Sequence, residues 1–240
     1  MEKDYHGLGE LIKETRAAFG DDEYARTITA AYYPDGRQEQ LLLKYGVDEF
    51  ADFLHIMAYD QTNGHHSSLS FAEKVINQGK DILPASQLTL GLPFYGRNSA
   101  TGDWKTYEDI VQQSPSTKNS DSLPGDNGGA WLFNGPSTIA TKTELAIQAG
   151  AGGVMVWEVG QDCRRVAVKR DGVEHRVTCP NGPEDSLLKS IAKVCVRCGP
   201  ACVWHVSTQV YSVCLGFKKV CIITAILFIS ILSFSRHIMT

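Results

Sequence analysis

Apolar residues recur along this chain with two alternating spacings. Spacings of three and four residues predict helices, and short apolar runs bounded by glycine, proline or polar residues predict strands. The helices predicted in this way span residues 8–19, 39–45, 70–78, 104–113, 136–149 and 186–194. The predicted strands span residues 26–33, 53–59, 88–97 and 154–157. Residues 114–129 are dense in Ser, Asn, Asp, Pro and Gly and are predicted to form a loop.

The predicted helices and strands alternate, which is typical of an α/β fold built from βαβ units. Such units contain parallel strands, and their crossovers are right-handed. The pattern by itself leaves two architectures open, an open doubly wound sheet and part of a barrel.

Two of the predicted helices carry local signals. The apolar stripe of the first helix consists of Leu8, Leu11, Ile12, Thr15 and Phe19. Gly20 follows directly and is a plausible end for this helix. Ser70 precedes Glu73 by three residues, which is a capping-box pattern, so Ser70 is predicted to cap the third helix.

Polar and aromatic residues follow three of the predicted strands. They are Tyr59, Asp60 and Gln61 after the second strand, Tyr95 and Arg97 at the end of the third, and Trp157, Glu158 and Asp162 after the fourth. In α/β barrels the carboxyl ends of the strands are where substrates bind. Aromatic rings stack on the apolar face of a sugar, and carboxylates accept hydrogen bonds from its hydroxyl and amide groups. These residues therefore predict a carbohydrate-binding cleft. The alternative is structural, with Asp60 as a helix cap and Tyr95 and Trp157 as core residues.

Three segments resemble, in order and in chemistry, strands six, seven and eight of the family 18 glycoside hydrolases, the chitinase family. They are Met-Ala-Tyr-Asp at 57–60, Gly-Leu-Pro-Phe-Tyr-Gly-Arg at 91–97 and Gly-Gly-Val-Met-Val-Trp-Glu at 152–158. Residues 27–34 then look like strand five, and residues 8–19 look like the helix before it. The resemblance covers residues 4–194 and implies the second half of a TIM-type (β/α)8 barrel. We therefore divide the chain into a chitinase-like domain, 1–194, and a separate tail, 195–240.

The resemblance assigns expected roles to six residues. By analogy with the family, Tyr59 and Asp60 hold the substrate N-acetyl group and the sugar on the reducing side, and Trp157 forms the floor at the scissile bond. Met57, Tyr95 and Arg97 match residues that line the same groove. The implied ligands are chitin or N-acetylglucosamine oligosaccharides. Family catalysis is assisted by the substrate's own N-acetyl oxygen, so that no protein nucleophile and no cofactor are expected.

The family's general acid is a glutamate within an Asp-x-x-Asp-x-Asp-x-Glu motif after strand four, and this motif does not occur in the sequence. Met1 falls where the motif would end, so we expect strands one to four to be missing. Loss of a positioned general acid costs about 10²–10⁴-fold in rate. We therefore expect no catalytic residue in this chain and no activity from it alone.

The distribution of charged residues separates the tail from the rest of the chain. The formal net charge is −4, which argues against nucleic acid as a general partner. All 27 acidic residues precede Val196, whereas four of the 23 basic residues follow it. No signal peptide is visible at the N-terminus, and the compartment cannot be assigned from the sequence.

The tail contains a CxxC pair, Cys195 and Cys198, followed by Cys202 and His205. A zinc site would need His205 as its fourth ligand, and ordinary thiols or translated non-coding sequence are the preferred interpretations, so we expect no metal. Residues 220–234 form an apolar run of fifteen residues, which is shorter than the roughly 20 that a bilayer helix needs. A marginal membrane anchor and an artefactual or disordered end both remain open.

Cys163 and Cys179 bracket a charged loop after the last strand, inside the chitinase-like region. In an oxidising compartment we expect them to pair with each other, and in a reducing cytosol we expect two free thiols.

Three functional classes follow from the sequence. The first is a chitinase-family fragment that is inactive alone, and the second is a chitinase-like lectin that binds without cutting. The third is a membrane-tethered interaction protein that has kept half a barrel. Retention of Tyr59, Asp60 and Trp157 favours descent from an active enzyme.

Overall fold

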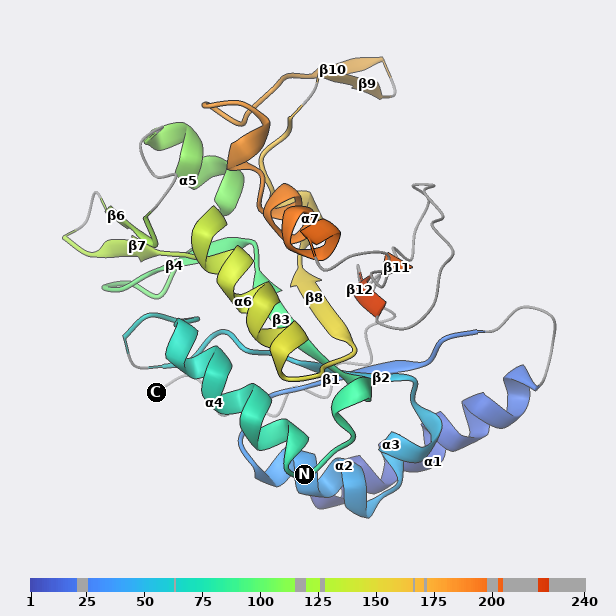
Figure 1. Ribbon diagram of the computed structural model, residues 1–240. Helices are drawn as coiled ribbons and strands as arrows, with labels where there is room; N and C mark the ends of the chain where they lie inside the picture. The colour runs from blue at the N-terminus through green and yellow to red at the C-terminus, as the bar shows by residue number, and fades with distance from the viewer. Residues whose placement is uncertain are drawn as a thin grey trace.

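The computed structural model describes residues 1–20, 26–62, 64–114, 120–125, 128–165, 167–170, 172–197, 203–204 and 220–224. Its main sheet contains four parallel strands that are adjacent in chain order (Figure 1). They are β1 (Thr29–Tyr32), β2 (Phe53–Ile56), β3 (Leu88–Pro93) and β8 (Gly153–Trp157). The predicted α/β class and parallel pairing are confirmed.

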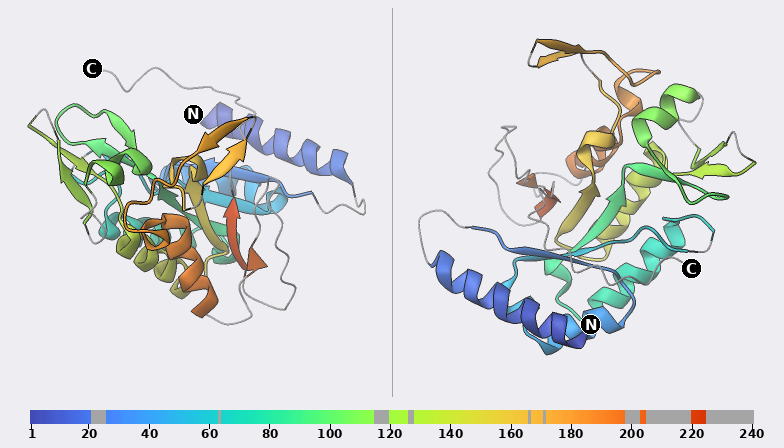
Figure 2. Two further views of the ribbon diagram at one scale, coloured as in Figure 1. Left: turned by 90° about the horizontal axis from the view of Figure 1, so that it is seen from above. Right: turned by 180° about the vertical axis from the view of Figure 1, so that it is seen from behind.

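Helices cover one side of this sheet, as the front and back views show (Figures 1 and 2). They are α1 (Glu2–Phe19), α2 (Arg37–Lys44), α3 (Val47–Phe50), α4 (Leu69–Lys80), α6 (Pro136–Gln148) and α7 (Leu187–Arg197). α4 packs on β2 and β3, α6 packs on β3 and β8, and α7 packs on α6. Short 3₁₀ turns lie at Ala85–Gln87, Val159–Gln161 and Pro183–Asp185.

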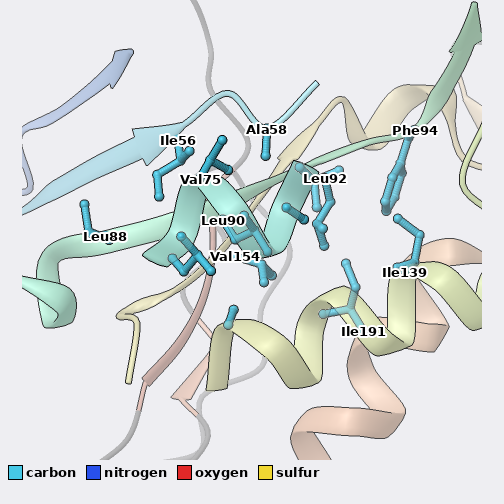
Figure 3. Packing of buried hydrophobic residues seen from close by; sticks show 14 of the residues in the cluster. Ile56, Ala58, Val75, Leu88, Leu90, Leu92, Phe94, Ile139, Val154 and Ile191 are labelled. Carbon is cyan, nitrogen blue, oxygen red and sulfur yellow. The ribbon is translucent and has the colours of Figure 1, made fainter. Parts of the chain in front are cut away.

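The core lies between the sheet and these helices (Figure 3). Strand residues Ile56, Leu90 and Val154 are fully buried there against Val75 of α4 and Ile139 of α6. Burying one side chain of this size stabilises the fold by about 1.5–3 kcal/mol. The core is therefore formed by the apolar side chains that produced the strand and helix patterns.

α1 is longer than predicted and turns a different stripe inward. It begins at Glu2, and Leu11, which the predicted stripe included, is 47% exposed. The buried residues of the helix are Gly9 and Ile12. A Cβ at Gly9 would lie 2.3 Å from the carbonyl oxygen of Tyr45, so only glycine allows the backbones to approach this closely.

The cap of α4 also differs from the prediction. Ser68, and not Ser70, occupies the N-cap position, and its hydroxyl accepts a hydrogen bond of 3.1 Å from the Phe71 amide. Ser68 has the extended backbone that a cap requires, whereas Ser70 lies within the first turn.

The predicted strand 88–97 is divided in the structure. β3 ends at Pro93, and the Phe94 amide then donates to the Trp157 carbonyl at 2.8 Å. The chain continues as β4 (Tyr95–Asn98), which belongs to a separate antiparallel sheet. The other strands of this sheet are β5 (Trp104–Thr106), β6 (Ser122–Pro124) and β7 (Ala130–Leu132).

Two neighbouring predictions change with this second sheet. The helix predicted for 104–113 is wrong for its first three residues, because they form β5 and the helix α5 spans Tyr107–Gln113. The predicted loop 114–129 contains β6. Three-residue strands are too short to show a period, so pairing with β4 and β7 determines these segments.

Three described elements reach or lie beyond the boundary predicted at residue 194. α7 continues to Arg197, past the boundary predicted at residue 194. β12 (Val220–Thr224) pairs in parallel with β8, and β11 (Val203–Trp204) pairs with β12. Residues 225–234 of the apolar run, and Cys198, Cys202 and His205, lie outside the described residues. Within the described residues, no helix has both the length and the apolar character needed to cross a membrane.

Candidate functional site

The residues expected to form a cleft lie beyond the carboxyl ends of β2, β3 and β8. Tyr59 and Tyr95 are 6% and 5% exposed and pack with the fully buried Met155. Met57 and Trp157 pack against this cluster and are partly buried. The structure therefore brings together four of the six expected residues around Met155.

The two tyrosines meet edge to face, with their ring centroids 6.1 Å apart. The hydroxyl of Tyr59 also donates to the sulfur of Met155 at 3.9 Å. Burial and the negative charge of Asp60 raise the pKa of both phenols, so both remain protonated donors at neutral pH.

Gly91 of β3 makes room for this cluster. A Cβ at this position would lie 2.3 Å from the Ile56 carbonyl oxygen and 2.9 Å from a ring carbon of Tyr59. β2 and β3 therefore approach each other closely at this point, and the Tyr59 ring lies across the gap.

Asp60 is held by its backbone and by an ion pair. Its φ is 60°, and it is the one non-glycine residue with positive φ among the described residues. Aspartate tolerates this left-handed conformation better than most residues do. Nε of Arg97 lies 2.9 Å from the Asp60 carboxylate. Thus Asp60 and Arg97, the remaining two expected residues, contact each other directly.

Asp60 is ionised at neutral pH. Burial raises its pKa, but polar contacts with His66, Arg97 and Tyr95 and the charge of Arg97 outweigh burial and hold the pKa well below the usual range. The expected capping role for Asp60 is not observed, because Ser68 caps α4. The carboxylate is a hydrogen-bond acceptor at the edge of the aromatic cluster.

His66 is a neighbour of the site that the sequence analysis missed. The residue is 3% exposed, its ring centroid lies 5.1 Å from that of Tyr95, and its Nδ1 lies 3.7 Å from the Asp60 carboxylate. Burial lowers the pKa of His66, although Asp60 opposes this effect. Met155 was missed as well, because it looked like an ordinary core residue of the strand.

Trp157 ends β8 and is partly exposed, and the peptide bond between Trp157 and Glu158 is cis. Its carbonyl accepts the hydrogen bond from Phe94, which fixes the end of β8 against the end of β3. Glu158 is exposed, and Gln161 donates to its carboxylate at 3.4 Å.

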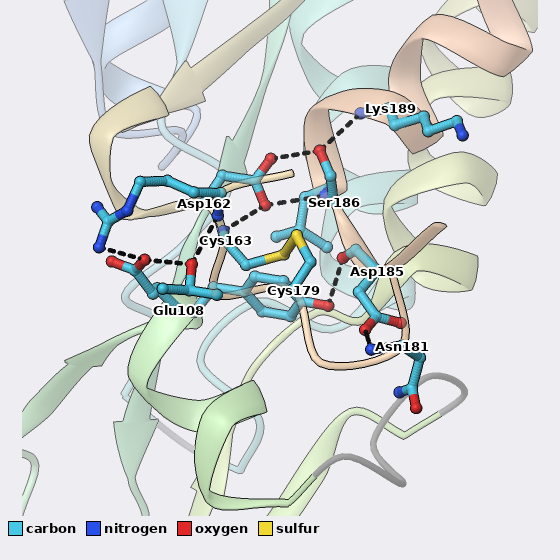
Figure 4. Close-up of a disulfide and its surroundings, with 12 residues drawn as sticks. Glu108, Asp162, Cys163, Cys179, Asn181, Asp185, Ser186 and Lys189 are labelled. Atoms are coloured by element: carbon cyan, nitrogen blue, oxygen red, sulfur yellow. Dashed lines mark hydrogen bonds and ion pairs between the residues drawn. A yellow bond between two sulfur atoms is a disulfide. The ribbon is translucent and has the colours of Figure 1, made fainter. Parts of the chain in front are cut away.

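Asp162 does not join the residues gathered beyond the ends of β2 and β3, contrary to the sequence analysis. Its carboxylate accepts hydrogen bonds from the amides of Leu187 and Leu188, both at 3.0 Å, and from the Ser186 hydroxyl at 2.8 Å (Figure 4). It also accepts from the Cys163 amide at 2.9 Å. Asp162 therefore connects the segment after β8 with the first turn of α7.

Cys163 and Cys179 are joined by a disulfide next to this connection, with a Cα–Cα distance of 5.0 Å (Figure 4). The bond closes a loop that contains the hairpin of β9 (Val168–Arg170) and β10 (Val173–His175). This hairpin extends away from the two sheets at the top of Figure 1.

The arrangement provides binding groups. An ionised acceptor, a guanidinium, two phenolic donors and a partly exposed indole lie at the ends of adjacent strands. Among the described residues, no group of three or more His, Cys, Asp or Glu side chains is arranged to hold a metal ion. This set of groups can bind a neutral polar ligand with an apolar face.

Solved structures with the same fold include several chitinases. A GH18 chitinase, ChiB, from the chitin utilization locus of Flavobacterium johnsoniae is 29% identical with a TM-score of 0.61, over 79% of this chain and 55% of that one. A GH18 chitinase from Cycas revoluta in complex with (GlcNAc)3 is 18% identical with a TM-score of 0.50, over 67% of this chain and 58% of that one. The fold is therefore of the α/β TIM type.

Sequence comparisons agree. Chitinase C of Streptomyces lividans is 28% identical, and the match covers 65% of this chain and 32% of that protein. Chitinase 63 of Streptomyces plicatus gives the same identity and coverage. This chain thus spans about a third of the length of these curated relatives. The sequence profile of the glycosyl hydrolases family 18 matches residues 2–162. The chain therefore belongs to glycosyl hydrolase family 18.

Proposed function

We propose that this chain carries the sugar-holding part of a chitinase-type site and binds N-acetylglucosamine oligosaccharides. Tyr59 and Asp60 bind the N-acetyl group and the sugar on the reducing side, and Trp157 stacks under the sugar at the scissile bond. Met57, Tyr95 and Arg97 line the same groove.

One observation carries this proposal: Asp60 is ionised and held by Arg97 beside two buried phenols in a family 18 chain. A carboxylate held in this way accepts a hydrogen bond from an amide N–H without reorganising. The neighbouring phenols donate, so that both ends of an acetamido group find partners. That the Cycas chitinase was solved with (GlcNAc)3 supports this choice of ligand.

We also propose that these residues form strands five to eight of a (β/α)8 barrel and that the 240-residue polypeptide does not hydrolyse chitin. The four parallel strands run in chain order with helices on one side, as consecutive barrel strands do. The Asp-x-x-Asp-x-Asp-x-Glu sequence that carries the family's general acid does not occur in these 240 residues.

Titration with N-acetylglucosamine oligomers, followed by tryptophan fluorescence or NMR, tests the binding. Stacking and each hydrogen bond contribute about 1 kcal/mol, so we expect a dissociation constant near 1 mM, or about −4 kcal/mol. Trp157→Ala removes the stacking contribution and should weaken binding about fivefold. Tyr107→Phe is the matched control, because it removes a buried hydrogen bond to the Asp185 carbonyl and leaves all six groove residues in place.

The outcomes separate the alternatives. Micromolar binding that is lost in Trp157→Ala, without release of sugar, would favour the lectin. An affinity that is unchanged in Trp157→Ala would show that β8 is not the sugar platform. Release of sugar by the pure 240-residue polypeptide would contradict the proposed lack of activity.

A further inference from the structure

Lys142 of α6 is fully buried, which is unusual for a lysine. Its Nζ donates to three oxygens, the Ser67 carbonyl at 2.7 Å, the Ser67 hydroxyl at 2.8 Å and the Asn134 amide oxygen at 2.6 Å. An ammonium group has three N–H donors, so this set of acceptors satisfies all of them. The side chain therefore makes specific contacts and does not merely fill space.

Ser67 is the residue on which these contacts converge, and each of its polar groups has a partner. Its amide donates to Nδ1 of His65 at 3.1 Å, and its carbonyl also accepts from the Asn134 side chain at 2.9 Å. Its hydroxyl donates to the Ala58 carbonyl at 2.7 Å while it accepts from Lys142. Lys142 thus orients the Ser67 hydroxyl toward the end of β2.

This network reaches the site from two directions. Ala58 directly precedes Tyr59 and Asp60, so the bond from Ser67 fixes the chain where it enters the left-handed turn at Asp60. On the other side of the network, His66 directly precedes Ser67, and its ring lies beside both Asp60 and Tyr95. Fixing Ser67 therefore constrains both the backbone of Asp60 and the His66 ring beside its carboxylate.

We propose that Lys142 is a positioning residue which, through Ser67, holds the turn that carries Tyr59 and Asp60. The ligand part of this inference rests on the proposed function, whereas the structural part does not. None of the hydrogen bonds of Lys142 reaches Tyr59, Tyr95 or Asp60. Lys142 therefore acts on the site through Ser67, which is bonded to Ala58 and directly follows His66.

The test compares variants in the full chain. Lys142→Met keeps an unbranched side chain that is one atom shorter, and it removes the three hydrogen bonds. Ser67→Ala removes the hydroxyl that links α6 to Ala58. Thr143→Val is the matched control, because Thr143 is the next residue of α6, is equally buried, and donates only to Ile139 of its own helix at 2.8 Å.

Hydrogen exchange measured by mass spectrometry reports how well the backbone amides of the turn are protected, and it needs no ligand. We expect faster exchange of residues 57–62 in Lys142→Met and in Ser67→Ala, with β8 and α6 unchanged. The double variant should be no faster than either single one, because both remove the same link. Thr143→Val should leave residues 57–62 unchanged.

Affinity for N-acetylglucosamine oligomers is the second readout, and we expect about a tenfold loss in Lys142→Met and none in Thr143→Val. Unchanged exchange of residues 57–62 in Lys142→Met, or additive effects in the double variant, would overturn the proposal. If the wild-type chain binds no sugar while the exchange results hold, the proposed function fails and the positioning role of Lys142 stands.

Discussion

Asp60 combines a left-handed backbone, a hydrogen bond from Arg97 and a lowered pKa in one residue. A carboxyl whose pKa is lower in the folded state than in the unfolded state adds stability above its unfolded pKa, and this stability is lost as the pH falls toward the folded value. The contribution of Asp60 should therefore be complete above about pH 5 and decline below the ordinary aspartate value of about 4.

We predict that Asp60→Asn flattens the loss of stability at acidic pH. Urea denaturation at pH 3 to 7 should give a midpoint that falls less steeply in the variant than in the wild-type chain, because the amide does not titrate. Asp81→Asn, at an exposed aspartate, serves as the control and should follow the wild type. Parallel pH profiles for Asp60→Asn and the wild type would contradict this account.

For single residues, the sequence was sufficient to identify site residues that lie at the ends of strands. Tyr59, Asp60, Tyr95 and Trp157 could be found because the carboxyl ends of parallel strands meet at one edge. Their proposed roles stay predictions. His66 and Lys142 could not be found, since a histidine in a polar loop and a lysine in a helix both resemble solvated residues, and only the fold shows that they are buried.

Among the helices, α7 depends on a residue outside it. Its first amides are bonded to Asp162, which lies 25 positions before Leu187 in the chain. Removing a helix cap costs about 0.5–2 kcal/mol, and a buried donor left without a partner costs about 1–3 kcal/mol.

We predict that Asp162→Ala lowers the free energy of unfolding by about 2–3 kcal/mol, and that Asp162→Asn, which keeps one acceptor oxygen, lowers it less. Chemical denaturation measures both changes. Glu144→Ala, at an exposed position of α6, should have little effect. Equal losses for Asp162→Ala and Asp162→Asn would show that the hydrogen bonds to α7 are not the cause.

The order of elements could be predicted because buried residues recur every three or four positions in the long helices and form short apolar runs in the long strands. The break at Phe94 could not, since Leu92, Phe94 and Tyr95 are all buried and the run looks continuous. Pairing of Phe94 with Trp157, which is 63 residues away, ends the strand there. Likewise Ser68 and Ser70 are chemically equivalent as caps, and the turn before α4 decides between them.

In the molecule as a whole, β1 has a partner on one side only. It pairs with β2, and among the described residues no strand pairs with its other side. The carbonyls of Ile28 and Tyr32 accept from the amides of Asp52 and Met57, which directly flank β2. By the alternation of a parallel ladder, the amide of Ala31 therefore points away from β2. Unpaired edges of this kind promote association.

We predict that the 240-residue polypeptide associates as its concentration rises and that Ala31→Pro reduces this association. Proline at Ala31 blocks the open edge without removing a bond to β2, whereas Ala30→Pro removes one and should destabilise the fold. Analytical ultracentrifugation and thermal melting together separate these effects. Association that is unchanged in Ala31→Pro would place the contact elsewhere.

Strand order and the place of the tail are properties of the whole molecule. Local periods predicted the parallel strands, but they could not show that residues 220–224 lie beside β8. An apolar run of this length is compatible with a sheet edge as well as with a membrane. The sequence alone therefore could not indicate that residues 220–224 pair with β8.

The disulfide makes the chain from Cys163 to Cys179 a covalent ring that carries the β9–β10 hairpin. Basic residues in this ring provide cleavage sites for trypsin: Arg164, Arg165, Lys169, Arg170 and Arg176. A single cut in the hairpin would therefore leave one molecule in which α7 is still attached to β8. After brief digestion, gel electrophoresis should show one band without reductant and two bands with it, and two bands without reductant would mean that the ring is open in solution.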